Sequence, residues 1–347
     1  MGVWRSMSKF AALCAVLAVL AACTQVDKDA AIKLADAGKT AATSGAAAAA
    51  ATRIDYVAGG ERSAAFRLLG RAASEGLTVQ SQFAAPDQAD LQKRLGTAAI
   101  LKQREEALTA LAATYVEMAA LASADPGANV RKASAELVDK ANGLATTVNT
   151  IAGGVPIPLI DKTAGAVFGE VAALYAEERQ RQEILATNKI IREALRVLQA
   201  SLGREREFVE SIREEVAVAR ANLANAALNQ GLVDQSATVA RVAELAGFAP
   251  VKDAAAAVAG AWIDGDAEQK RRQRLVWALA GFEKFRADAK AAAVKDASET
   301  LEKALAKLDA GHAKIAEGKP FGAEEALTLA MALKDAVARI RAADEGK

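Results

Sequence analysis

The chain has 347 residues, of which 52% are hydrophobic but only 4% aromatic. Lysine and arginine (44) nearly balance aspartate and glutamate (43), so the chain lacks the basic excess that is typical of nucleic-acid binding. Alanine supplies much of the apolar content, only six prolines interrupt the chain, and alternating strand-like runs are lacking. This composition is typical of long, closely packed helices, and it predicts an all-α fold.

The first 22 residues have the parts of a secretory signal peptide. Arg5 and Lys9 give a basic head, and an uncharged apolar run covers residues 10–20. A run of that length is too short to span a bilayer, which needs about 20 residues. The run leads into the sequence Leu20-Ala21-Ala22-Cys23.

This ending resembles the lipobox of bacterial lipoproteins, in which an apolar residue and two small residues precede a cysteine. The resemblance covers only the start of the chain. It implies transfer of a lipid to the Cys23 sulfur, cleavage before Cys23, and a membrane-anchored mature chain of residues 23–347 that carries acyl chains such as palmitate. Cys14 does not fit, because Leu13 occupies the place of a small residue. Thr24 replaces the aspartate that favours inner-membrane retention in lipoproteins of enteric type, so the resemblance favours an outer-membrane anchor facing the periplasm.

The mature chain then reads as helices separated by glycine and proline. Gly59-Gly60 is predicted to break the first helix, and Asp125-Pro126-Gly127 is predicted to end the third. The helices expected in this half of the chain are 27–58, 61–84, 87–123 and 128–150.

Residues 141–160 carry no charged side chain, although they join two long helices. Two glycines and two prolines within residues 151–160 forbid a continuous helix. Because an exposed turn is normally polar, two interpretations stay open. Either the turn is buried beneath residues 236–263, or it is a tip that meets a membrane or a partner. The side chains of such a tip would be Val155, Ile157, Leu159 and Ile160.

Residues 161–230 are predicted to form one long helix with the clearest periodicity of the chain. Apolar residues follow one another at spacings of four and three, which is typical of a coiled-coil seam, with Asn188 and Glu205 as polar exceptions. The seam residues expected to face the core are Ile191, Leu195, Leu198, Leu202, Val209, Ile212, Val216 and Leu223.

The last third of the chain is predicted to contain short apolar helices at 236–263 and two further helices at 266–315 and 322–342. Gly318-Lys319-Pro320 should separate the last two. A basic cluster near the start of the 266–315 helix is a candidate anion site, which could bind anionic lipid heads or glycan phosphates. Its members are Lys270, Arg271, Arg272 and Arg274.

His312 is the only histidine of the chain. Its spacing predicts a place on or beside an apolar helix face formed by Leu301, Leu305, Leu308 and Ile315. One histidine, and no cysteine after Cys23, leave nucleophilic catalysis without its usual partners and exclude most histidine-based metal sites. Because phosphate-binding and nucleophile-elbow motifs are also lacking, we expect neither an enzyme nor a cofactor.

Taken together, these patterns predict an elongated antiparallel helical bundle with coiled-coil-like long helices. The leading hypothesis is a non-enzymatic, lipid-anchored scaffold or adaptor of the cell envelope. Its partners would be the membrane, through Cys23, and an envelope protein, with no nucleic acid. The alternative is a membrane-active protein that uses the apolar turn, similar in plan to helical pore-forming toxins. A ligand-binding bundle or an enzyme is the third hypothesis.

Overall fold

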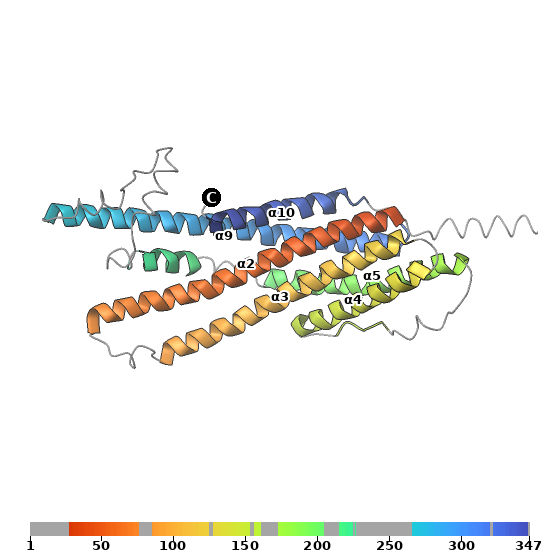
Figure 1. The fold of residues 1–347 in the computed structure, drawn as a ribbon, viewed down its shortest axis with the longest axis horizontal. Helices are drawn as coiled ribbons and strands as arrows, with labels where there is room; N and C mark the ends of the chain where they lie inside the picture. The colour runs from red at the N-terminus through yellow and green to blue at the C-terminus, as the bar shows by residue number, and fades with distance from the viewer. Residues whose placement is uncertain are drawn as a thin grey trace, which may run out of the picture. The chain divides into compact units, whose positions relative to one another are not determined.

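A computed structural model describes most of the chain between Lys28 and Glu345. The described residues are almost wholly helical and contain no strand, so the predicted all-α fold is confirmed (Figure 1). The predicted signal, Cys23 and the predicted short helices at 236–263 lie outside the described residues. The described ranges are 28–75, 85–124, 128–152, 156–160, 173–204, 215–224, 226, 266–319 and 322–345.

Six long helices make up most of this structure. They are α2 (Lys28–Glu75), α3 (Ala85–Ser123), α4 (Ala128–Ala152), α5 (Ala173–Arg204), α9 (Asp266–Ala316) and α10 (Glu324–Glu345). A further helical stretch covers residues 215–224. The helices predicted at 128–150, 266–315 and 322–342 match α4, α9 and α10 to within three residues at each end. The long helix predicted at 161–230 is helical over 173–204 and 215–224, and the remainder of it lies largely outside the described residues.

The chain divides into two compact units. The first unit comprises Met1–Ala49, Gln103–Arg204 and Asp296–Val337. The second unit comprises Ala50–Lys102, Glu205–Lys295 and Ala338–Lys347. The helices α4 and α5 therefore belong wholly to the first unit, whereas α2, α3, α9 and α10 each supply residues to both.

Two glycines of α2 let neighbouring helices approach closely in the first unit. A Cβ atom on Gly38 would lie 2.3 Å from Cζ of Tyr115, and one on Gly45 would lie 2.7 Å from Leu301 and 3.4 Å from Leu108. A side chain at Gly38 would overlap the rigid Tyr115 ring, so this contact requires glycine, whereas one at Gly45 would displace the end of the Leu301 side chain. Since Gly45 follows Gly38 in α2 whereas Leu108 precedes Tyr115 in α3, the two helices run antiparallel.

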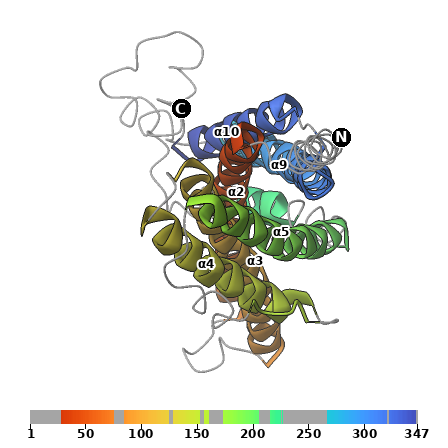
Figure 2. The ribbon, with the colours of Figure 1, turned by 90° about the vertical axis from the view of Figure 1, so that its right-hand side faces the viewer.

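The predicted seam is buried along α5. Leu202, at its end, is only half-buried, as are Val216 and Leu223 in the stretch 215–224 of the second unit. The helix α4 packs against α5 (Figure 2). The seam residues of α5 that are almost inaccessible to solvent are Ile184, Asn188, Ile191, Leu195 and Leu198.

The Gly59-Gly60 pair does not break α2, so that prediction is wrong. A Cβ atom on Gly59 would lie 2.6 Å from Val216, and one on Gly60 would lie 2.6 Å from the Arg94 side chain. Each glycine costs a helix about 1 kcal/mol relative to alanine, and the close packing at these two positions offsets that cost. The Arg94 guanidinium also lies 5.4 Å from the centre of the Tyr56 ring. These glycines serve packing within the second unit.

The start of α3 also differs from the prediction. The helix begins at Ala85 and includes Pro86, whereas the sequence predicted a start at residue 87. Proline is tolerated in the first turn because its missing N–H would have no partner inside the helix there.

The end of α9 lies where the sequence predicts it. Gly318 has a φ of 65°, a left-handed conformation that favours glycine. The N–H of Lys319 donates to the Lys314 carbonyl at 2.9 Å, and the N–H of Gly318 donates to the Ile315 carbonyl at 3.1 Å. These two bonds form a Schellman motif, which satisfies the last carbonyls of α9 and ends the helix before α10.

Candidate functional site

Two buried polar residues, Asn188 and His312, lie on largely apolar helix faces in the first unit. Asn188 lies in the seam of α5 and is 1% exposed. His312 lies in α9 and is fully buried. A buried polar group without a hydrogen-bond partner is costly, so the role of these two side chains is given by their hydrogen-bond partners. The buried apolar residues of α9 that share the spacing of His312 are Leu301, Leu305, Leu308 and Ile315.

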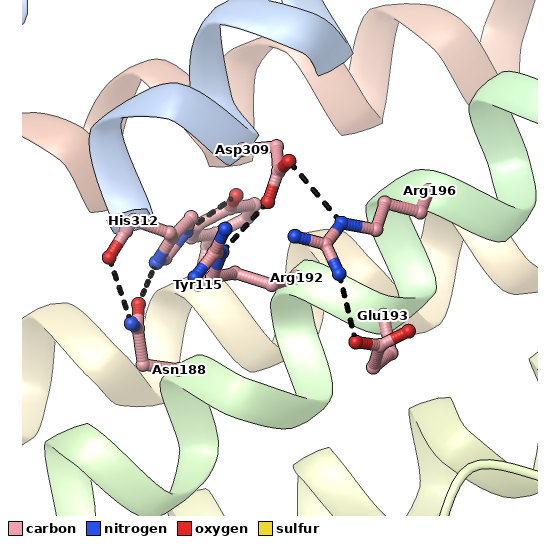
Figure 3. Close-up of polar contacts among 7 residues, drawn as sticks. All are labelled: Tyr115, Asn188, Arg192, Glu193, Arg196, Asp309 and His312. Atoms are coloured by element: carbon pink, nitrogen blue, oxygen red, sulfur yellow. Dashed lines mark hydrogen bonds and ion pairs between the residues drawn. The ribbon is translucent and has the colours of Figure 1, made fainter. Parts of the chain in front are cut away.

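Asn188 and His312 connect α5 to α9 (Figure 3). The Asn188 Nδ2 donates to the backbone carbonyl of His312 at 2.8 Å, which fixes the orientation of the amide. The Asn188 Oδ1, which can only accept, then faces Nδ1 of the His312 ring. Nδ1 must therefore carry the proton, and the lone pair of the neutral imidazole lies on Nε2.

Tyr115 of α3 completes this arrangement. Its hydroxyl lies 2.9 Å from Nε2 of His312, and it donates to the lone pair there. The two rings are stacked, with their centroids 5.6 Å apart. Tyr115 is fully buried, and the absence of a side chain at Gly38 of α2 makes room for its ring. We call Tyr115, Asn188 and His312 the core polar cluster.

Burial lowers the pKa of His312 to about 3. The charge of Asp309 opposes this shift, and the charge of Arg192 adds to it. Burial, together with the charge of Asp309, raises the pKa of Tyr115 well above its usual value. Both side chains are therefore neutral near pH 7, in agreement with the hydrogen bonds of the core polar cluster.

A chain of ion pairs lies beside the core polar cluster, at the edge of α5 and α9 (Figure 3). Arg192 binds Asp309 at 2.8 Å, and Arg196 binds Asp309 at 3.4 Å and Glu193 at 3.0 Å. Between 22% and 49% of each side chain is exposed, so each pair contributes little to stability on its own. The pairs reinforce the contact between α5 and α9.

The core polar cluster is built to hold helices together. Each ring nitrogen of His312 and the Tyr115 hydroxyl has a protein partner, so none of them is available to a substrate. Among the described residues, no group of three or more histidine, cysteine, aspartate or glutamate side chains could hold a metal ion. The cluster therefore offers specific contact between helices and no reactive group.

The described part of the uncharged turn, residues 156–160, is tied to α4 by two asparagines. Asn149 accepts from the Ile157 N–H at 2.7 Å and donates to the Ile157 carbonyl at 3.2 Å. Asn142 makes the same pair of bonds with Ile160, at 2.8 Å and 3.0 Å. Because the asparagines are seven residues apart, they lie on one face of α4, two turns from each other. The segment thus runs antiparallel to α4.

The turn has both buried and exposed side chains. Ile157 is 5% exposed, Leu159 is 59% exposed, and Ile160 is intermediate. Val155 lies outside the described residues. The uncharged sequence predicted one environment for the whole turn and did not point to Asn142 and Asn149. The signal that could have found them is their seven-residue spacing just before a proline-rich, uncharged segment.

The other residues singled out from the sequence are not brought together in the described structure. Leu20, Ala21, Ala22 and Cys23 lie outside it. The backbone of α9 contains the whole basic cluster, but the side chains of the cluster also lie outside the described part of the chain. The members of that cluster are Lys270, Arg271, Arg272 and Arg274.

These features define an all-α protein in which a buried polar cluster joins three helices of one unit. No protein-family model matches the chain, and neither a curated protein nor a solved structure matches it significantly. Of the helices that the structure describes, none combines the length and the apolar character needed to cross a bilayer.

Proposed function

We propose that this chain is a lipid-anchored protein of the bacterial cell envelope, with a non-enzymatic role as a scaffold or adaptor. The observation that carries the proposal is the sequence Leu20-Ala21-Ala22-Cys23 at the end of a signal-like apolar run. The described helical structure begins at Lys28, five residues after Cys23. A tether of that length reaches on the order of 20 Å when fully extended. The helical domain would therefore work close to the membrane surface, on the periplasmic side of the outer membrane.

The described side chains support a non-enzymatic role. The only histidine is fully buried with both ring nitrogens engaged, so it cannot act as a general base on a substrate. The other two members of the core polar cluster are buried as well. A scaffold built from helices needs specific contacts of this kind in its core and no reactive group.

The anchor is tested by metabolic labelling with palmitate of the full chain in a bacterial host. We expect Cys23→Ala to abolish labelling and leave the protein unprocessed, because the sulfur that receives the lipid is lost. Cys14→Ala is the matched control and should leave labelling unchanged, since Cys14 lies within the predicted signal. A labelled and processed Cys23→Ala protein would contradict the proposal.

The alternative, a membrane-active protein that uses its apolar turn, is favoured by one observation, the exposure of Leu159. We test it by liposome binding of residues 24–347, which include every residue that the structure describes. Leu159→Asp should abolish binding if this side chain enters the bilayer, because a carboxylate there is costly. We expect the parent chain not to bind. Binding that is lost in Leu159→Asp would favour the membrane-active function over the scaffold.

A further inference from the structure

The segment 156–160 contacts α4 with a period of three residues. Asn149 binds the N–H and the carbonyl of Ile157, and Asn142 binds the same two groups of Ile160. Ile157 is also buried and Ile160 partly buried, so residues three apart face α4 in the same way. A β-strand would turn residues three apart to opposite sides, because its side chains alternate. A polyproline II helix has three residues per turn and presents such residues to one side.

The dimensions of the contact agree with a polyproline II conformation. Three residues of polyproline II advance about 9.3 Å, and the seven-residue step from Asn142 to Asn149 advances about 10.5 Å along α4. Pro156 and Pro158 favour the same backbone, because the ring fixes φ near about −65° and the residue before a proline avoids the helical region. The segment 156–160 is therefore a short polyproline II helix that packs on α4.

The outer sides of this short helix are apolar and exposed. With three residues per turn, Pro156 and Leu159 share one side, and Pro158 lies on another. All three residues are exposed, Leu159 by 59%. No residue of 141–160 is charged, so a partner that covers this surface would not have to remove water from a charged group. Exposed prolines in this conformation are what aromatic-lined grooves recognise.

We propose that Pro156, Pro158 and Leu159 form a docking motif for an envelope protein whose aromatic-lined groove binds polyproline II segments. Aromatic rings of the partner pack on the two proline rings and on the Leu159 side chain. The four hydrogen bonds from Asn142 and Asn149 hold the motif in its bound conformation beforehand, which lowers the entropy cost of association. The docking motif rests on the adaptor role proposed above and gives the chemistry of the partner.

The conformation of the motif is tested by NMR spectroscopy of residues 24–347. We expect the couplings between the amide and α protons of Ile157 and Leu159 to correspond to a φ of about −75°, the polyproline II value. Couplings that correspond to a φ of about −120° to −140° would indicate a strand and would contradict the docking motif.

The partner is tested by photo-crosslinking in the native bacterium. The full chain carries benzoylphenylalanine, a photoreactive apolar side chain, in place of Leu159. We expect one protein adduct, and mass spectrometry should place the crosslink beside tryptophan or tyrosine residues of the partner. These aromatic residues are the signature of a groove that binds polyproline II.

Two variants of the crosslinking chain show whether the prolines carry the binding. Pro156→Ala and Pro158→Ala should each lower the yield of the adduct about fivefold or more, since loss of an anchoring side chain commonly weakens binding by that factor. Both substitutions lie at exposed positions, so far-UV circular dichroism should not change. Lys132→Ala is the control on the surface of α4, where the lysine side chain is 80% exposed, and it should leave the yield unchanged.

Several outcomes would overturn the docking motif. It is wrong if no protein adduct forms, or if the crosslinked site of the partner lacks aromatic residues. Equal yields from Pro156→Ala and Lys132→Ala would mean that the prolines play no part. Crosslinking to lipid alone would assign Leu159 to the membrane. A chain that gives the adduct without palmitate labelling would refute only the anchor, whereas a labelled chain without the adduct would refute only the docking motif.

Discussion

His312 stays neutral in the folded chain at pH values where an exposed histidine takes up a proton. Its pKa is lowered from 6.5 to about 3, mainly by burial. Between these two pH values the unfolded chain binds one proton more than the folded chain does. The free energy of unfolding must therefore decrease as the pH falls through this window, and the contribution of His312 is complete above about pH 6.5.

We predict a steeper acid sensitivity for the parent chain than for a His312→Gln variant. Between about pH 6.5 and pH 5, this histidine should remove up to about 1.4 kcal/mol of stability per pH unit. Urea unfolding across that range measures how the free energy of unfolding changes with pH. The contribution of His312 to this change should be absent from the variant. The single imidazole signal in NMR spectra should remain that of a neutral ring at about pH 5. An imidazole that titrates near pH 6.5 in the folded protein would contradict the burial of His312.

Gly38 and Gly143 make a matched pair of glycines inside helices. A Cβ on Gly38 would overlap the Tyr115 ring, whereas one on Gly143 of α4 would meet no atom within 4 Å. We predict that Gly38→Ala destabilises the protein by about 1–3 kcal/mol, as overpacking usually does. Gly143→Ala should stabilise it by about 0.5–1 kcal/mol through helix propensity. Urea unfolding of both variants measures these changes in the free energy of unfolding. Equal changes would show that Tyr115 does not contact α2 closely.

At the level of whole elements, α5 has a buried face and a solvent-facing edge that lie side by side. Leu198 is 1% exposed, whereas the Arg196 side chain is 49% exposed and forms only partly solvated ion pairs. We predict that Leu198→Ala costs about 2–5 kcal/mol and Arg196→Ala less than about 1 kcal/mol. Thermal and urea unfolding measure the loss in the free energy of unfolding for each variant. Similar losses would mean that the buried face of α5 was assigned wrongly.

The segment 156–160 lends itself to a comparison of two neighbouring substitutions. Ile157 is buried and tied to Asn149, whereas Leu159 is mostly exposed. We predict that Ile157→Asp lowers the free energy of unfolding by several kcal/mol, because it buries an unpaired carboxylate. Leu159→Asp should change it by no more than about 0.5 kcal/mol. If Ile157→Asp melted at the parent temperature, the segment would not be held against α4 in solution.

The sequence predicted the helices better than their contacts. Glycine and proline breaks located α4, α9 and α10, and apolar periodicity located the buried face of α5, because burial of apolar side chains fixes that pattern locally. The break signal failed at Gly59-Gly60, because a glycine that breaks a helix and one that admits a neighbour look alike in one sequence. Asn188 stood out as a polar interruption and His312 as the only histidine, but their pairing depends on how α5 and α9 meet.

At the scale of the molecule, four long helices supply residues to both units. The division falls after Ala49 in α2, after Lys102 in α3, before Asp296 in α9 and after Val337 in α10. A helix has no weak point at such a place, since its hydrogen bonds form cooperatively. We predict that residues 187–204 of the first unit and 215–224 of the second lose hydrogen-exchange protection at the same urea concentration. Separate transitions, measured by mass spectrometry of peptides, would show that the units unfold independently.

Gly38 and Gly45 of α2, which admit side chains from neighbouring helices, also help to fix the register of α2. Long stretches of α2 are alanine, as in residues 46–51, and an alanine surface is much the same one turn further along. Such helices can slide past each other at little cost, and misaligned pairings compete with the native one. Gly38 makes room for the Tyr115 ring of α3, and Gly45 makes room for the Leu301 side chain of α9, so one alignment places both large side chains opposite a missing one. These two gaps give an otherwise repetitive helix a single favoured register.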